Sequence, residues 1–299
     1  LGNVLKELGR IDDAKAKFTQ AIVLKPDFAE AHYNLGNVFE QQKNLVAATE
    51  CYKTAITHKP DFAEAYDNLG VTFLTLGDSY EAAVCCNQAI KLRPDLTDAY
   101  VNLGIAIKNI RFKASDPKFY PALIQLLTKK NSLRPRDLAP SILSLLKHDP
   151  LIKDFLLNQS IIKNITDTTR IIKRLDRLTL LHQLMRVCPL PDQQFELAFK
   201  TIRSSLLNNL DKLDKSPELI NFLSTLSLQC FTNEYIYGST AKEIQLVDHL
   251  EKEIAQTISR SEQPEVLKVI CLATYRRLCQ FSWCQKLTVL DHFTEIKSR

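Results

Sequence analysis

The first third of the chain repeats a pattern of large, small and polar residues every 34 positions. Leucine followed by glycine recurs at 1–2, 35–36, 69–70 and 103–104, and large residues such as Phe39 and Tyr52 alternate with small ones. Alanine and proline recur with the same spacing, at Ala14, Ala48 and Ala82, at Ala21, Ala55 and Ala89, and at Pro26, Pro60 and Pro94. This long period predicts helix pairs that bury their apolar faces only by stacking on their neighbours.

Each recurring residue type has a predicted structural role. The glycines and alanines are expected where the two helices of a pair cross closely, because only small side chains fit there. Each proline is expected to end a second helix, since it lacks an amide hydrogen and disfavours helix in the residue before it. The segments Asp27–Glu30 and Asp61–Glu64 predict capping boxes at the start of the next helix, and Asp95 with Asp98 predicts a weaker one.

These features resemble the tetratricopeptide repeat (TPR), which implies a right-handed superhelix of helix pairs. The resemblance divides residues 1–112 into a partial repeat at 1–28, repeats at 29–62 and 63–96, and the first helix of a fourth at 97–110. Leu1 corresponds to the seventh position of a repeat. We therefore expect the chain to be a fragment that further repeats precede.

The regular pattern ends after Ile110, which places a domain boundary near 111–117. Asp116 stands where a small residue is expected, and Pro117 follows it. Residues 113–299 show helical spacing without a second period and predict a separate helical linker or regulatory domain. The expected helices span 118–130, 137–147, 151–157, 161–187, 192–210, 217–230, 240–259, 265–280 and 284–296. The predicted fold class is all-α.

Composition narrows the class of protein. Hydrophobic residues make up 45% and charged residues 24% of the chain, which favours a substantial core over disorder. No run approaches the roughly 20 apolar residues that span a bilayer, and no leader peptide precedes the repeats, so we expect a soluble cytoplasmic protein. The eight cysteines form no CxxC pair and are expected to be reduced and buried. The basic excess lies entirely in residues 113–299, with 27 Lys and Arg against 20 Asp and Glu.

The most informative polar set is an asparagine at the sixth position of three successive repeats, namely Asn34, Asn68 and Asn102. The first helix of a TPR lines the concave side of the superhelix, so these residues, the asparagine ladder, are expected to follow the groove, with Asn3 and Asn37 on the same face. A side-chain amide offers a donor and an acceptor, which suits binding to the backbone of an extended peptide. The alternative is that these amides bridge neighbouring repeats or face water.

Three segments resemble the TPR region of O-linked GlcNAc transferases, whose groove asparagines hold substrate peptides. They are His32–Asn37, Ala65–Gly70 and Leu1–Lys6. The resemblance is limited to residues 1–110. It implies a peptide in the groove, and more distantly a role in directing a glycosyltransferase to its substrates.

The second part resembles the helical region between the repeats and the catalytic domain of bacterial TPR-containing S-adenosylmethionine (SAM) methyltransferases. The stretches that carry this resemblance are 131–138, 144–146, 189–192 and 228–237. It implies that the chain recruits substrates for a SAM-binding domain lying beyond Arg299. No glycine-rich SAM loop occurs within the chain, so these residues are expected to be catalytically inert and to bind no cofactor.

Three further clusters contain residue types that could carry chemistry. Phe231, Tyr235 and Tyr237, with Glu234, fit a pocket or ordinary helix packing, and packing is favoured. Cys271, Cys279, Cys284 and His292 lack the close pairing of zinc ligands, so no metal is expected. The basic run Lys163, Arg170, Lys173, Arg174 and Arg177 lacks interleaved aromatics and is interpreted as a solvated helix face. The sequence thus predicts a protein or peptide partner, no nucleic acid and no membrane, and leaves the oligomeric state open.

Overall fold

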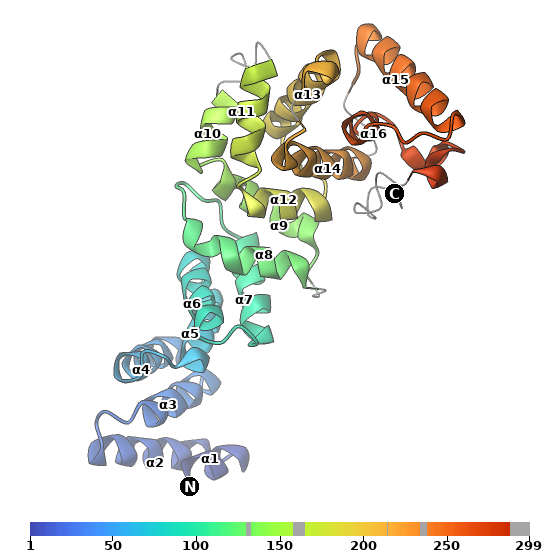
Figure 1. Ribbon diagram of the computed structural model, residues 1–299. Coiled ribbons are helices and arrows are strands. Elements are labelled where there is room, and N and C mark those ends of the chain that lie inside the picture. Colours follow the sequence, from blue (N-terminus) through green and yellow to red (C-terminus); the bar gives the residue numbers. More distant parts are fainter. Residues whose placement is uncertain (130–132, 158–164, 214, 234–237, 288–299) are drawn as a thin grey trace. The chain divides into compact units, whose positions relative to one another are not determined.

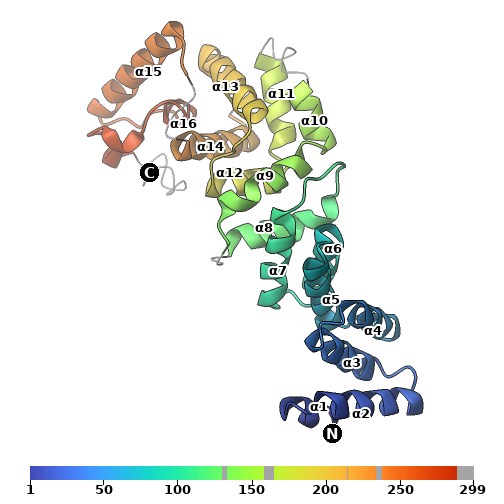
Figure 2. The same cartoon turned by 180° about the vertical axis from the view of Figure 1, so that it is seen from behind.

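A computed structural model describes residues 1–129, 133–157, 165–213, 215–233 and 238–287, and every regular element in these ranges is helical (Figures 1 and 2). The chain folds into two compact units. The first unit comprises Leu1–Arg111 with Lys129–Arg134, and the second comprises Phe112–Thr128 with Pro135–Arg299.

The first unit consists of successive helix pairs, drawn from blue to teal in Figure 1. Its helices are α1 (Gly2–Glu7), α2 (Ile11–Leu24), α3 (Ala29–Gln41), α4 (Leu45–His58), α5 (Ala63–Leu76), α6 (Ser79–Leu92) and α7 (Thr97–Lys108). Packing is most extensive within the pairs α3–α4 and α5–α6, while α4 packs on α5 and α6 on α7 to join neighbouring repeats. Helices α2, α4 and α6 each end two residues before a recurring proline, as predicted.

The small residues lie at close helix crossings, which confirms their predicted role. A Cβ atom added to Gly36 would lie 2.6 Å from Cε1 of Tyr52, and one added to Gly70 would lie 2.7 Å from Sγ of Cys86. Ala48 and Ala82 are both 0% exposed. The backbone of the first helix at these glycines therefore lies directly against side chains of the second helix, with no room for a larger residue.

The predicted capping boxes are wrong. Helices α3 and α5 have Phe28 and Phe62 at their N-caps, without a side-chain cap. Each aspartate therefore lies one position too early for a capping box and each glutamate one position before N3. The weaker box at Asp95 and Asp98 fails in the same way, because Leu96 is the N-cap of α7.

The glutamates of these segments instead form ion pairs with the end of the following helix. Glu30 Oε1 accepts a hydrogen bond from Lys59 Nζ at 3.0 Å, and Glu64 pairs with Arg93 at the equivalent position one repeat later. Side-chain caps occur at the second helices, where Asn44 and Asp78 accept from the amides of Ala47 and Glu81 at 3.2 Å each.

The second unit is a set of helices of unequal length, drawn from green to red in Figure 1. They are α8 (Tyr120–Thr128), α9 (Pro135–Leu146), α10 (Pro150–Leu157), α11 (Ile165–Leu175), α12 (Thr179–Val187), α13 (Gln193–Asn208), α14 (Pro217–Thr232), α15 (Ala241–Ser259) and α16 (Val266–Ala273). Helix α14 is central, because it packs against α11, α12 and α16. Short 3-10 turns occupy 117–119, 210–212, 278–280 and 284–286.

Several expected helices of the second unit differ from the prediction. The helix expected at 118–130 is only Tyr120–Thr128, and a 3-10 turn occupies 284–286, where the helix expected at 284–296 begins. The single helix expected at 161–187 is divided at 176–178, where the Asp176 carboxylate turns inward and accepts a hydrogen bond from Asn221 Nδ2 at 2.6 Å. The helix expected at 265–280 ends at Ala273, and beyond it the Tyr275 hydroxyl donates to Glu243 on α15 at 3.0 Å. Residues 161–164 and 288–296 of the expected helices lie outside the described residues.

The cysteines are unpaired, as predicted. All eight are free thiols; Cys279 is exposed, Cys51 is half-buried and the others are buried. Burial raises the pKa of Cys230 and of Cys271 to about 12, so both are protonated at neutral pH. None of the helices that the structure describes combines the length and the apolar surface needed to cross a bilayer.

Enlarging a crossing alanine should destabilise the repeats. Ala48→Leu and Ala82→Leu each place a larger side chain where no space exists, and overpacking costs about 1–3 kcal/mol. We expect a lower urea midpoint for each variant, measured by circular dichroism. Ala16→Leu is the matched control, because Ala16 is exposed on α2. Unchanged midpoints in both variants would contradict the tight crossing.

Candidate functional site

Two members of the asparagine ladder are tied to the preceding repeat through their amide nitrogens. Asn68 Nδ2 donates to Tyr33 Oη at 3.1 Å, and Asn102 Nδ2 donates to Asp67 Oδ1 at 3.0 Å. In both cases the acceptor lies 35 residues earlier. Asn68 Nδ2 also donates to Asn37 Oδ1 at 2.8 Å. The donor end of these amides therefore bridges repeats, which is the alternative that the sequence left open.

Asn37 belongs to a network that reaches the core. The hydroxyl of Tyr52, which is 0% exposed, lies 2.7 Å from Asn37 Oδ1 and 2.9 Å from Glu40 Oε2. Burial and the Glu40 carboxylate raise the pKa of Tyr52, so the hydroxyl stays protonated and donates. Asn37 thus accepts from two neighbours and positions Asn68.

Asn34 differs from the other two members of the ladder. Its Nδ2 donates to the carbonyl oxygen of Glu30 at 2.8 Å, within its own helix. Asn34 and Asn3 line the same open hollow of about 590 Å³. The other residues that line it come from α1, α2, α3 and the segments beside them, and are Leu1, Gly2, Lys17, Phe18, Gln20, Ala21, Leu24, Phe28, Glu30 and Ala31. These two asparagines therefore share a surface that could hold a chain.

The acceptor ends of the ladder are available. Among the residues that the structure describes, the Oδ1 atoms of Asn68 and Asn102 accept no hydrogen bond. Both side chains are half-buried, and each is held by its nitrogen. Fixing one end of an amide orients the other, so these oxygens are preorganised to accept a hydrogen bond from a backbone N–H.

The bridging partners Tyr33 and Asp67, and Tyr52, which holds Asn37 within its own repeat, were not predicted from the sequence. Tyr33 and Asp67 occupy the same position of successive repeats but differ in type, so no recurrence marks them. Both partners could have been found as the polar residue directly before an asparagine of the ladder, because that residue lies 35 positions before the next asparagine of the ladder. Asp67 is only 8% exposed, and its burial raises the pKa of its carboxyl although the Asn102 bond opposes the shift.

Among the other sequence candidates, the basic run lines a hollow together with Lys212, apart from Lys163, which lies outside the described residues. Within the described ranges, no group of three His, Cys, Asp or Glu side chains is placed to hold a metal ion, and His292 lies outside those ranges. The guanidinium of Arg277 stacks 5.4 Å from the centre of the Phe231 ring. Glu234, Tyr235 and Tyr237, the remaining members of the aromatic cluster, lie outside the described residues.

The buried Asp67 carboxyl should give the stability a specific pH dependence. The pKa of this carboxyl is raised above the ordinary value of 3.8. The contribution of Asp67 to the free energy of unfolding is therefore fully present below about pH 3.8 and is lost as the pH rises through the raised pKa. Asp67→Asn removes the ionisation and keeps an acceptor for Asn102. We expect the free energy of unfolding of this variant, relative to that of the unsubstituted chain, to increase over that pH window, measured by urea unfolding. A pH-independent difference would contradict the raised pKa.

Comparison with known families agrees with the helix pairs of the first unit. Residues 2–43 match the family described as TPR repeat, and residues 29–62 and 63–96 each match the tetratricopeptide repeat. A search of curated proteins found none that matches the chain. Residues 2–96 are therefore tetratricopeptide repeats, and further helices follow them.

Proposed function

We propose that the repeats bind an extended peptide or protein segment along the face that carries Asn3, Asn34, Asn37, Asn68 and Asn102. Tetratricopeptide repeats in general point to a protein partner. Recognition of the peptide by these asparagines is supported by the two ends of each amide. Nδ2 of Asn68 and Asn102 donates to the preceding repeat, and Oδ1 is left as an acceptor.

This arrangement recognises peptide backbone and not side chains. Every non-proline residue of an extended peptide carries one N–H, and each can donate to an asparagine oxygen of the ladder. A neutral hydrogen bond contributes about 0.5–1.5 kcal/mol net, so several in register are needed for useful affinity. Asn37 serves in this scheme by orienting Asn68, and Asn3 and Asn34 extend the surface into the hollow beside α1 and α2.

Replacing Asn34, Asn68 and Asn102 together by alanine should weaken peptide binding. The expected loss is about 0.5–1.5 kcal/mol for each hydrogen bond removed. The measurement is binding of the full chain to an array of synthetic extended peptides, with the helical signal checked by circular dichroism. N-methylating alternate backbone nitrogens of a bound peptide should weaken binding as well, because it removes the proposed donors.

The control is Asn109→Ala, because Asn109 is exposed beyond the end of α7 and lies outside the ladder. It should leave the array signal unchanged. Binding that survives the triple substitution, or that tolerates N-methylation, would contradict backbone recognition by the ladder.

A second proposal concerns the larger protein. We infer from the sequence stretches in 131–237 that residues 113–299 form a linker or regulatory domain and that the chain is the substrate-recruiting part of a SAM-dependent methyltransferase. The alternative, which is based on the segments in 1–110, is the same role for a glycosyltransferase. Neither resemblance has further support in the family comparisons. Calorimetric titration of SAM into the 299-residue chain tests the first, since we expect no heat of binding and saturable micromolar binding would overturn the assignment.

A further inference from the structure

The second unit carries a strongly basic hollow of about 530 Å³ along α11. It is lined by five cationic side chains and two hydroxyls, namely Arg170, Lys173, Arg174, Arg177, Lys212, Thr166 and Thr169. None of the described residues that line it is acidic. Lys212 comes from the 3-10 turn after α13, so this hollow is a product of the fold and not only of one basic helix.

The positive charges are distributed along a line. Arg170 and Arg174 lie on successive turns of α11, about 6 Å apart along its axis, and Arg177 lies just beyond its C-terminal end. Charges spaced in this way match several negative groups along a chain better than they match one phosphate, which convergent donors would surround.

Neighbouring carboxylates neutralise this row only in part. Arg170 Nη2 lies 3.2 Å from Asp167 Oδ1, and the Arg170 side chain is 66% exposed, so the pair is weak. Arg174 pairs with Asp154 at 2.7 Å, also at the surface. Within the part of the chain that the structure describes, no ion pair engages Arg177 or Lys212.

The acidic residues that precede Arg177 and Lys212 in the sequence have other partners. The Asp176 carboxylate accepts from Asn221, and Asp211 faces Lys268 Nζ at 3.9 Å. The hollow therefore keeps a net positive charge that an acidic ligand would complement.

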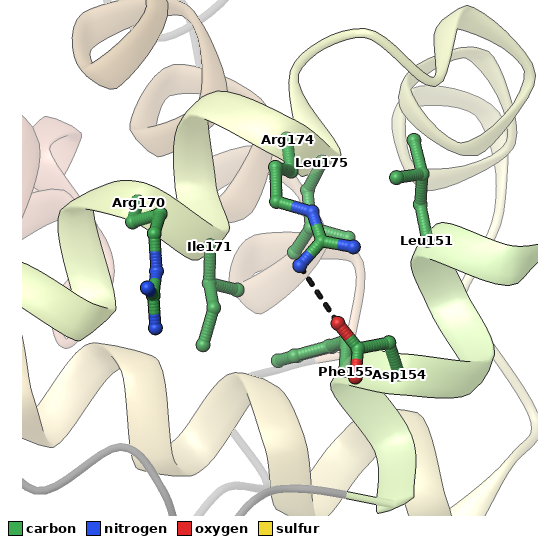
Figure 3. Close-up of a pocket in the computed structure, with 7 residues that line it drawn as sticks. All are labelled: Leu151, Asp154, Phe155, Arg170, Ile171, Arg174 and Leu175. Carbon is green, nitrogen blue, oxygen red and sulfur yellow. Dashed lines mark hydrogen bonds and ion pairs between the residues drawn. The ribbon is translucent and has the colours of Figure 1, made fainter.

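A smaller hollow of about 110 Å³, lined by four apolar and three charged residues, adjoins the basic one between α10 and α11 (Figure 3). Both hollows share Arg170 and Arg174. The remaining lining residues of the smaller one are Leu151, Asp154, Phe155, Ile171 and Leu175. Figure 3 shows Arg174 reaching Asp154 from one helix to the other, with Ile171 between Arg174 and Arg170. Its volume exceeds that of a few water molecules, at about 30 Å³ each, and suits one apolar side chain.

We propose that these joined hollows bind an acidic peptide segment that carries one apolar anchor residue. The cationic row would take Asp and Glu side chains, and the pocket between α10 and α11 would take the anchor. A single-stranded nucleic acid fits less well, because no aromatic residue lines the basic hollow and Phe155 is only 4% exposed, which leaves its ring no free face for base stacking. This site is separate from the asparagine ladder and does not depend on it.

Fluorescence anisotropy with a labelled peptide tests the proposal on the full chain. The probe is a peptide of about 12 residues, Asp and Glu throughout with one central Leu; at about 3.3 Å per residue it extends to about 40 Å, which is longer than the row and leaves acidic residues on both sides. Arg177→Glu combined with Lys212→Glu should weaken its binding at least about tenfold and reduce its salt dependence. Replacing the central Leu by Ser should weaken binding by about tenfold or more, and this change cannot unfold the protein.

The matched control is Lys252→Glu combined with Arg260→Glu, which makes the same change of charge at exposed positions of the same unit. It should leave binding unchanged, and circular dichroism should show equal helical content in both double variants. Equal weakening by the control would mean unspecific attraction and would overturn the proposal. Tighter binding of a poly-U oligonucleotide than of the peptide, or loss of peptide binding in the triple asparagine variant, would also overturn it.

Discussion

The close crossing of the two helices within each repeat is the constraint on which the first unit depends. A helix pair of this kind cannot bury its apolar face alone, and stacking on the next pair requires that its own helices approach closely. Gly36 and Gly70 allow that approach, since the Tyr52 ring and the Cys86 sulfur occupy the space that a Cβ would need. Because every crossing uses the same positions, side chains on the first helices recur at a fixed interval along one face.

The asparagine ladder follows from that fixed interval. Asn68 and Asn102 reach the preceding repeat because stacking places the residue 35 positions earlier within hydrogen-bonding distance. From the sequence, bridging between repeats and peptide recognition are alternative roles for these asparagines. One amide is able to fill both, because its nitrogen donates to the neighbouring repeat while its oxygen is left to accept from a peptide. Aspartate would lose the donor that holds the repeat, and leucine would lose both ends. The asparagines at 68 and 102 are thus explained by the bond between repeats alone, whereas Asn34 donates within its own helix, and the free oxygen is what the proposed function adds.

The sequence predicted features that recur every 34 residues. It did not predict features that depend on the exact residue at which a helix begins, or on contacts between residues far apart in the sequence. The prolines located the ends of α2, α4 and α6, but one intervening residue, Phe28, was enough to undo the capping box that Asp27 and Glu30 suggested. In the second unit no period exists, and the break at 176–178 lies where Asp176 contacts Asn221, a residue far along the chain that the local pattern does not reveal. The basic run by itself predicts only a solvated face, because Lys212, which completes the hollow, lies outside it.

The most direct test of the account is hydrogen exchange of the asparagine side-chain amides, measured by NMR on chain labelled selectively with 15N-asparagine. The bonds to Tyr33 and Asp67 should slow exchange at Nδ2 of Asn68 and Asn102 relative to the exposed Asn109, because a hydrogen-bonded donor must open before it exchanges. Exchange at Asn68, Asn102 and Asn109 with the same rate would contradict the central claim that Asn68 and Asn102 tie their repeats to the ones before them.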